Sequence, residues 1–435
     1  MKIATLFFLL LISAAVAQPP PATPIPPKLI TNPGPEYRHA ARKWQGIPGI
    51  EVSPGGRLWA TWYGGPAGEG EPGNHQTLVT SGDDGRTWSD PVAVFQPEPV
   101  DKSRCGDGHL WLDPQGRLWW VVNRYLKDDP SPLGPRTSWA FINTQPDDAQ
   151  PQWSGPILLG PGVGLNKPTV LSTGEWLTPL DNFSADPKST DPRFSKGGKV
   201  YASTDHGATW NFRAAVEIPE VTFAEHMLAE RKDGSLWLLA RTSYGVAQST
   251  SQDHGLTWSV GEPFTREMNV NTRFFLRRLK SGRMLLVVND DPKTRKQLTA
   301  MLSDDDGRTF PHKLLLDERK TSYPDGTETA DGSLYLVYDQ ERYTRGAQQI
   351  LFARITEADI LAGKIVTPTS RLAQKINRLA DFGGGIDDQW VADEKIRAAD
   401  RAKKRAGKAD AANPVRDTPE KLEESLKQPA KQPQP

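Results

Sequence analysis

Apolar residues in this chain gather in short runs that come in pairs, and each pair is joined by a polar turn with a glycine. Six such pairs occur: IPGIEVSPGGRLWATWYGG, HLWLDPQGRLWWVVN, KPTVLSTGEWLTPLDN, HMLAERKDGSLWLLAR, FFLRRLKSGRMLLVVN and PDGTETADGSLYLVYD. Their turn glycines are Gly56, Gly116, Gly174, Gly234, Gly282 and Gly332. Each pair is typical of two antiparallel strands in a tight hairpin.

The spacing of these hairpins predicts the architecture. Successive turn glycines are 60, 58, 60, 48 and 50 residues apart. Repeated strand-rich units of this length favour a six-bladed β-propeller, with all-β structure throughout. The 14 tryptophans fit the wedges between blades. One large β-sandwich is the alternative.

A second repeat has the form S-x-D-x-G-x-T-[WF]. It occurs as SGDDGRTW, STDHGATW, SQDHGLTW and SDDDGRTF, beginning at Ser81, Ser203, Ser251 and Ser303. Asp-x-Gly suits a tight turn, because the carboxylate accepts backbone N–H groups and glycine supplies a positive φ. The pattern lacks the alternating ligands and distal glutamate of a calcium loop. We therefore interpret the boxes as structural turns whose aromatic ring wedges between neighbouring sheets.

The two ends of the chain differ in composition from the hairpin region. Residues 1–17, MKIATLFFLLLISAAVA, are predicted to be a secretory signal peptide, which implies an exported, periplasmic or secreted protein. Residues 18–37 are proline-rich and predicted to be a spacer. Residues 371–435 are charged and predicted to be a largely disordered tail, which leaves 38–370 for the propeller.

Charge and cysteine content narrow the possible partners. The 53 basic residues balance 53 acidic ones, which gives no electrostatic reason to expect nucleic acid or an anionic membrane. Cys105 is the single cysteine, so no intrachain disulfide can form. The seven histidines show no metal-ligand spacing. We expect a monomer without metal or cofactor that acts on a glycan or glycoconjugate.

The hairpins predict where a site would lie. Residues at equal distances before and after a turn share one rim of a propeller, around the mouth of its central channel. Nine residues before each turn glycine stand Ile47, Asp107, Leu165, Glu225, Arg273 and Tyr323. Seven residues after it stand Tyr63, Asn123, Asp181, Arg241, Asn289 and Asp339. The polar members of these sets come from separate segments, and we expect them to converge at the mouth.

Two of these residues suggest a reaction. Tyrosine has a pKa of about 10 and is a weak nucleophile, so Glu225 beside Tyr323 would be needed to take its proton. A phenol suits attack beside an anionic group, where a carboxylate nucleophile would be repelled. Arg241 and Arg295 would then clamp that anion. Together these residues predict a site for a sugar acid.

At these positions the sequence resembles the sialidase (neuraminidase) superfamily, whose Asp-boxes match the S-x-D-x-G-x-T-[WF] repeats. The resemblance covers nearly all of 38–370 and implies a tyrosine nucleophile paired with a glutamate. SYPDG matches the tyrosine segment at Tyr323, and FAEHMLAERKDGSLWLLAR matches the segment from Glu225 to Arg241. The resemblance also places Arg295 as the third arginine of the family's triad and Asp339 as the acid that supports an arginine.

Two positions depart from the family pattern. Gly46 in QGIPGI stands where the first arginine of the triad is expected, and we expect Arg273 to supply the missing cation. The loop GPAGEGEPGNHQ has no aspartate where the family has its acid/base residue. Glu69, with a raised pKa, is the first candidate for general acid, with His75 and Asp107 as alternatives.

Lys167 in LNKPTV is expected near the same rim, either binding a substrate oxygen or as a solvated strand start. The sequence as a whole favours an exo-glycoside hydrolase of the sialidase type that removes terminal acidic sugars. Two alternatives remain: another acidic-sugar enzyme, such as a polysaccharide lyase or a uronate-directed hydrolase, and a non-catalytic carbohydrate-binding propeller.

Overall fold

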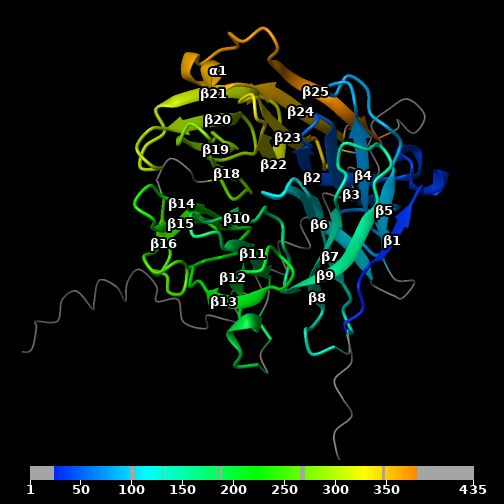
Figure 1. Ribbon diagram of the computed structural model, residues 1–435, viewed down its shortest axis with the longest axis horizontal. Coiled ribbons are helices and arrows are strands. Elements are labelled where there is room, and N and C mark those ends of the chain that lie inside the picture. Colours follow the sequence, from blue (N-terminus) through cyan, green and yellow to red (C-terminus); the bar gives the residue numbers. More distant parts are fainter. Residues whose placement is uncertain are drawn as a thin grey trace, which may run out of the picture.

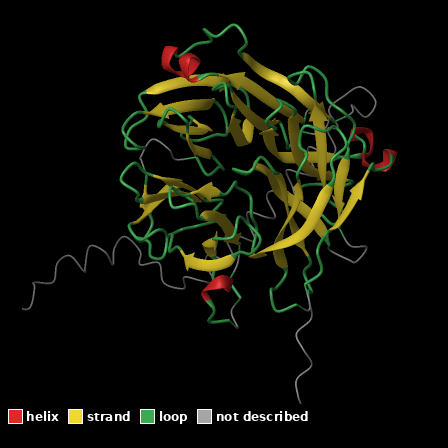
Figure 2. Ribbon diagram, in the orientation of Figure 1, coloured by secondary structure: helices red, strands yellow, loops and turns green. Residues whose placement is uncertain are grey.

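The computed structural model describes residues 24–97, 103–129, 131–183, 185–186, 189–264, 270–344 and 348–379. Six antiparallel sheets stand around a central axis, which confirms the six-bladed β-propeller (Figure 1). Figure 2 shows that helical segments are few and lie at the periphery. Each of the six sheets is built from one continuous stretch of chain, and only in the first sheet does the order of strands depart from the sequence, because β1 lies beside β5.

The strands are named by blade. Blade 1 contains β1 (Lys28–Thr31), β2 (Trp44–Val52), β3 (Leu58–Gly65), β4 (His75–Ser81) and β5 (Ala93–Gln96). Blade 2 contains β6 (Arg104–Leu112), β7 (Leu118–Tyr125), β8 (Arg136–Asn143) and β9 (Trp153–Pro161). Blade 3 contains β10 (Thr169–Val170), β11 (Trp176–Asn182), β12 (Gly197–Ser203) and β13 (Asn211–Ala215).

The second half follows the same plan. Blade 4 contains β14 (Met227–Glu230), β15 (Leu236–Thr242), β16 (Gly245–Ser251) and β17 (Glu262–Pro263). Blade 5 contains β18 (Phe275–Arg278), β19 (Met284–Asn289), β20 (Leu298–Ser303) and β21 (His312–Asp317). Blade 6 contains β22 (Thr321–Glu328), β23 (Leu334–Gln340), β24 (Gln349–Ile355) and β25 (Arg371–Arg378). The described part of the chain has one α-helix, α1 (Glu357–Ala362), and 3-10 turns at Pro35–Tyr37, His39–Ala41 and Pro192–Phe194.

The propeller extends beyond the expected limits of 38 and 370 at both ends. Lys28–Thr31, expected in the spacer, pairs with β5, and Arg371–Arg378, expected in the tail, pairs with β24. Both are edge strands whose residues are mostly exposed or half-buried, and charged side chains are common on such strands. The predicted signal peptide, 1–17, and the tail beyond 379 lie outside the described residues.

The four repeated boxes are structural turns, as predicted. In the second box, Asp205 Oδ1 accepts from the backbone of Thr209 at 2.9 Å, and its Oδ2 accepts from the Thr209 hydroxyl at 2.6 Å. Ser203 donates to Asp205 and accepts from the backbone N–H of Gly207. The same four contacts recur in the boxes that begin at Ser81, Ser251 and Ser303.

The boxes also hold adjacent blades together. Trp210, which ends the second box, lies with ring centroids 6.4 Å from both Trp119 of blade 2 and Trp176 of its own blade. Trp88 of blade 1 packs edge-on against Phe352 of blade 6 at 6.0 Å. These aromatic wedges bury the surface between sheets, which supplies much of the stability of the fold.

The rim contains a second set of inter-blade contacts, made by the residues seven positions after each turn glycine. Asp181 of blade 3 accepts from the backbone N–H of Ala224 in blade 4 at 2.7 Å, and Asp339 of blade 6 accepts from Ile47 of blade 1 at 3.0 Å. Asn123 accepts from the backbone N–H of Gly164 in the next blade. Arg241 donates to Asn271, and Asn289 donates to the backbone oxygen of Thr321. Tyr63 packs its ring against Gly106, where a Cβ would lie 2.9 Å from the ring. We call these six contacts the rim bridges.

Ring closure between blades 6 and 1 relies on side chains, because no strand is exchanged between these two sheets. Asp84 in the first box accepts hydrogen bonds from Tyr335, Arg354 and Arg371 of blade 6. Asp325 Oδ2 accepts from the backbone N–H of Ile50 at 3.0 Å. The closure is thus polar at both the periphery and the centre of the ring.

The packing of the boxes is testable at Gly207. Its φ is +83°, and a Cβ there would lie 2.3 Å from Trp119, whereas Gly234 has φ +82° and open space around it. Both Gly→Ala changes meet the same backbone strain, but only Gly207→Ala also overpacks a wedge. We expect Gly207→Ala to lose about 1–3 kcal/mol more free energy of unfolding than Gly234→Ala, measured in urea. Equal losses would show that the wedge is not tightly packed.

A rim bridge predicts a dependence of stability on pH. Burial raises the pKa of Asp181 to about 6, and its Oδ1 has no hydrogen-bond partner. A carboxyl with a raised pKa stabilises the fold below its ordinary pKa, near 4, and this contribution is lost as pH rises through 6. Asn123 makes the equivalent bridge as a neutral amide.

The wild-type protein should therefore lose about 3 kcal/mol of unfolding free energy between pH 4 and pH 7, and Asp181→Asn should not show this loss. The measurement is urea unfolding of both proteins across this range. An identical pH profile for the wild-type and variant proteins would contradict the assignment.

Candidate functional site

The backbone turns into the left-handed region at the rim of four blades. The residues are Ile47, Asp107, Glu225 and Tyr323, with φ of 58°, 52°, 39° and 56°. Three of them interrupt the register of the first strand of a blade, between Gly46 and Gly49, Gly106 and His109, and Ser322 and Asp325. Such bulges aim a side chain away from the regular pleat, and strained backbone of this kind clusters at functional sites.

Tyr323 and Glu225 are in direct contact. The Tyr323 hydroxyl donates to Glu225 Oε1 at 3.0 Å, although the two residues come from blades 6 and 4. Arg241 Nη1 lies 2.9 Å from Glu225 Oε2 and 3.3 Å from the Tyr323 hydroxyl. All three side chains are buried. The phenol, carboxylate and guanidinium therefore form one closed triangle at the mouth.

The environment keeps the phenol protonated. Burial raises the pKa of Tyr323, and the charge of Glu225 raises it further, while Arg241, Arg342 and Arg295 act in the opposite direction. A protonated phenol attacks poorly, so its reactivity depends on proton transfer to a base within reach. Glu225 is placed for that transfer.

Two more guanidinium groups face the ring of Tyr323. Arg342 Cζ lies 4.4 Å from the ring centroid, and Arg295 Cζ lies 5.8 Å from it. Arg295 donates to the backbone oxygen of Asn271 at 3.2 Å. Sequence reasoning found Arg295 but missed Arg342, which follows the rim residue Asp339 by three positions and pairs with it at 3.5 Å. That spacing was the available signal.

Glu69 lies at the site, but its electrostatics differ from the expectation. Its carboxylate is hydrogen-bonded to Arg342. Burial raises the pKa of Glu69, but the nearby Arg342 and Arg295 outweigh this, and the net direction is downward. The expected raised pKa was wrong for the site as it stands, because the sequence did not reveal the paired arginine.

The two alternatives to Glu69 lie in different surroundings. Burial raises the pKa of Asp107, whose carboxylate accepts from Tyr125 and pairs with Arg104 at 3.5 Å. His75 packs edge-on against Tyr37 at 5.0 Å, and burial lowers its pKa to about 4. His75 is therefore neutral at physiological pH and is not placed as an acid.

Asp339 has the supporting role that the resemblance implied. It bridges to Ile47, accepts from Ser322 at 2.6 Å and pairs with Arg342. Burial raises the pKa of Asp339, and Arg342 opposes that shift. Its contacts lie within the protein, which favours a positioning function over substrate contact.

Lys167 and Arg273 lie in a buried network at the axis and not in the clamp around Tyr323. Lys167 Nζ donates to Ile50 O, Leu110 O and Glu51 Oε2 at 2.7, 2.6 and 2.9 Å, and it lies 3.3 Å from Asp325. These contacts occupy all three N–H donors of Lys167. Both predicted roles, binding a substrate oxygen and a solvated strand start, were therefore wrong.

Arg273 is held by the backbone oxygen of Leu165 at 3.0 Å and by Asn166, and it lies 3.8 Å from Asp325. Its expected place beside Arg241 and Arg295 was wrong. The reason is local: Leu165 and Arg273 lack the left-handed φ found at the same position in the other four blades. Their blades therefore lack the backbone turn that directs Glu225 and Tyr323 towards each other.

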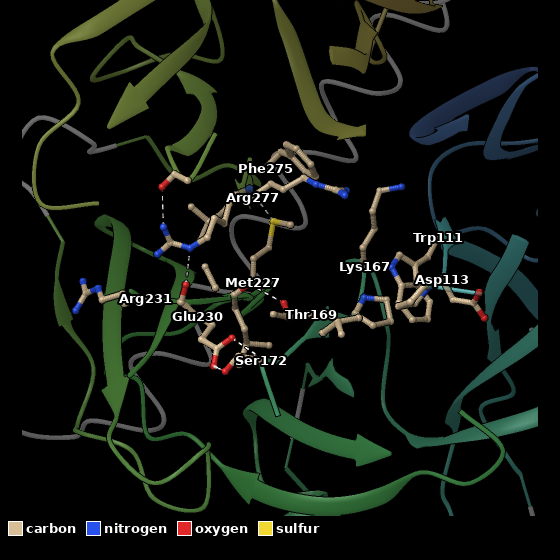
Figure 3. Close-up of a pocket in the computed structure, with 18 of the residues that line it drawn as sticks. Trp111, Asp113, Lys167, Thr169, Ser172, Met227, Glu230, Arg231, Phe275 and Arg277 are labelled. Carbon is tan, nitrogen blue, oxygen red and sulfur yellow. Dashed lines mark hydrogen bonds between the residues drawn. The ribbon is translucent and has the colours of Figure 1, made fainter. Parts of the chain in front are cut away.

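A separate cavity of about 680 Å³ opens on the hairpin-turn face, where Gly234 and Gly282 line it. Figure 3 shows Met227, Phe275 and Arg277 opposite Trp111 and Lys167 in this cavity. Tyr323 and Glu225 are not among its lining residues. The cavity is thus distinct from the mouth that holds the candidate site.

The described residues contain no group of three His, Cys, Asp or Glu side chains arranged to hold a metal ion. Among those same residues, no helix is long and apolar enough to cross a membrane.

Comparison with known proteins connects this geometry to a family. Residues 102–336 match the model of the BNR repeat-like domain family, which is more than half of the chain. An anhydrosialidase from Macrobdella decora is 34% identical over 145 residues, a match that spans 33% of this chain and 17% of that protein.

Solved structures share the fold at lower sequence identity. A Hadza microbial sialidase has a TM-score of 0.57 and 20% identity, covering 70% of this chain and 66% of that one. An intramolecular trans-sialidase from Ruminococcus gnavus has a TM-score of 0.55 and 16% identity, covering 78% and 99%. The repeated boxes, the six blades and the family match together lead to one conclusion: this chain belongs to the BNR repeat-like domain family and has the sialidase propeller fold.

Proposed function

We propose that this chain is an exported sialidase-like glycosidase that removes terminal sugar acids from glycans, with Tyr323 as nucleophile. The observation that carries the proposal is the 3.0 Å contact between the Tyr323 hydroxyl and Glu225, enclosed by arginines. A structural tyrosine would need no such pairing with a buried carboxylate and several cations.

The triangle suits the first step of the reaction. Glu225 takes the phenolic proton as the Tyr323 oxygen attacks the anomeric carbon, and the bond from that carbon to the leaving oxygen breaks. Arg241 contacts both groups, so its charge stabilises the phenolate as it forms. The product of this step is a covalent glycosyl-tyrosine, and a second displacement would release the sugar with retained configuration.

The leaving oxygen needs a proton in the same step. Glu69 is the proposed donor, because it reaches the cluster around Tyr323 through Arg342, from the loop between β3 and β4. It must first be protonated, since Arg342 and Arg295 lower its pKa in the unliganded site. Asp107 has the raised pKa that a general acid requires, so it is the alternative donor.

The choice of tyrosine fits an anionic substrate. Arg241 and Arg295 carry positive charge close to the phenol, where a substrate carboxylate would be attracted. A carboxylate nucleophile at this place would repel that substrate and compete for the same guanidiniums. The cluster therefore favours a sugar acid over a neutral sugar.

A second outcome of the same chemistry is internal transfer. The anhydrosialidase that matches this chain and the intramolecular trans-sialidase that shares its fold favour this possibility by their names. In internal transfer, a hydroxyl of the bound sugar acid replaces water as the second nucleophile. The product is then lighter than the hydrolysis product by one water molecule, so mass spectrometry of released sugar distinguishes the two outcomes.

The nucleophile assignment is tested by removing one oxygen. With a fluorogenic sialoside as substrate, we expect Tyr323→Phe to lower turnover by about 10³-fold or more, and Glu225→Gln to be similarly damaging. Tyr201→Phe is the matched control, because Tyr201 is a buried tyrosine of blade 3 whose hydroxyl has no hydrogen-bond partner.

Melting curves should show that the variant proteins remain folded. Near-normal turnover in folded Tyr323→Phe would exclude the covalent mechanism. A wild-type protein that binds sialosides without releasing sugar would favour a non-catalytic propeller, and activity on uronic-acid glycans alone would favour another acidic-sugar enzyme.

A further inference from the structure

Arg342 is almost fully enclosed at the mouth of the propeller, at 3% side-chain exposure. It follows β23 and contacts residues of blades 6 and 1. Its guanidinium stacks over Tyr323 and donates to the carboxylate of Glu69 of blade 1. Its Nη2 also donates to the Tyr343 hydroxyl at 2.7 Å.

The space at Gly46 explains why this arginine matters. A Cβ on Gly46 would lie 3.1 Å from Asp339 Oδ2 and 3.1 Å from the ring of Trp44, so the neighbours close tightly around the glycine. An arginine side chain would have to begin in this filled space. Asp339 pairs with Arg342 at 3.5 Å, so the acid that would support an arginine in blade 1 supports one from blade 6.

Buried N–H donors on two arginines suit an anionic ligand. Arg342 Nε and Arg295 Nη1 are buried and make no hydrogen bond, and Arg342 Nη1 makes none either, although it pairs with Asp339 at 3.5 Å. Buried guanidinium N–H groups are rarely left without acceptors, because desolvating them is costly. Both side chains face Tyr323, so an acceptor bound beside the phenol could satisfy them.

We propose that Arg342 is the third cation of the clamp, and that the carboxylate of the substrate displaces Glu69 from it. This inference rests on the proposed function and adds a residue and a coupling to it. Arg342 then joins Arg241 and Arg295 around one carboxylate, and binding of the sugar acid frees Glu69 for the leaving oxygen.

The displacement changes the protonation of Glu69. Arg342, Arg295 and Tyr343 are the charged and titratable groups that shift the pKa of Glu69. Asp107 and Tyr63 also interact electrostatically with Glu69. When the substrate carboxylate neutralises the arginines, the burial of Glu69 is no longer offset and its pKa rises. Glu69 then takes a proton from water, so affinity for the acid falls as pH rises.

The first measurement isolates the carboxylate. The probes are 2,3-didehydro-2-deoxy-N-acetylneuraminic acid and its methyl ester, with binding measured by calorimetry. We expect the wild-type protein to prefer the acid, and Arg342→Gln to lose about 10-fold or more of that preference while binding the ester nearly unchanged. Arg308→Gln, at an exposed arginine of the last box, is the matched control and should bind both probes like wild type.

The second measurement detects the proton. Calorimetry of the acid in two buffers of different ionisation heat, at one pH, gives the protons taken up on binding. Wild-type protein should take up protons, and Glu69→Gln should take up fewer. This comparison also decides the proposal if Arg342→Gln does not fold.

The results test the role of Arg342 separately from the proposed function. An unchanged preference for the acid in folded Arg342→Gln, or equal proton uptake in wild-type and Glu69→Gln protein, overturns the role of Arg342 and leaves the proposed function standing. Failure of wild-type protein to prefer the acid over the ester overturns both.

Discussion

The rim bridges are the contacts on which both the fold and the site depend. Each runs from the second strand of one blade to the start of the next blade, so the ring and the mouth are fixed by the same side chains. Arg241 bridges to Asn271 through Nε while its Nη1 contacts Glu225 and Tyr323. Asp339 bridges to Ile47 and also holds Arg342. The reactive groups are therefore positioned by contacts that the propeller requires in any case.

Charge inside the mouth is close to balanced, and this balance sets what the site can bind. Arg241 is paired with Glu225, whereas Arg342 is shared between Glu69 and Asp339. Buried charges are costly unless they are paired, so removal of one partner changes the state of the others. A bound carboxylate would enter as a new partner for the arginines, which links substrate binding to the protonation of Glu69. The second charged network pairs Lys167 with Glu51 and Asp325, and it joins blades near the axis.

Much of this arrangement was predictable from the spacing of the turn glycines. Counting back and forward from each turn placed Tyr323, Glu225, Arg241 and Asp339 at one rim, and the structure brings them together. The same count failed for Arg273, because a hairpin rule fixes the height of a residue along the axis but not the left-handed φ that turns its side chain towards the mouth. Lys167 failed for a related reason: its acceptors are backbone oxygens of blades 1 and 2, which no sequence pattern marks.

The site features that the sequence did not predict lie in loops and depend on contacts between them. Arg342 stands in a turn after β23, outside the strand positions that repeat from blade to blade, so only its spacing of three residues from Asp339 marked it. Because Arg342 was missed, the pKa of Glu69 was predicted in the wrong direction. A hydrogen-bonded arginine lowers the pKa of this carboxyl and outweighs the effect of burial. Residues at regular strand positions were thus predictable, while those whose role depends on a contact between loops were not.

The central claim is that Tyr323 forms a bond to the sugar, and covalent trapping tests it most directly. The protein would be exposed briefly to a 3-fluorosialosyl fluoride, which slows breakdown of a glycosyl-enzyme, and then digested and analysed by tandem mass spectrometry. We expect one added sugar-acid mass on the peptide that contains Tyr323, localised to that residue. An adduct on Glu225 or on another side chain, with Tyr323 unmodified, would contradict it.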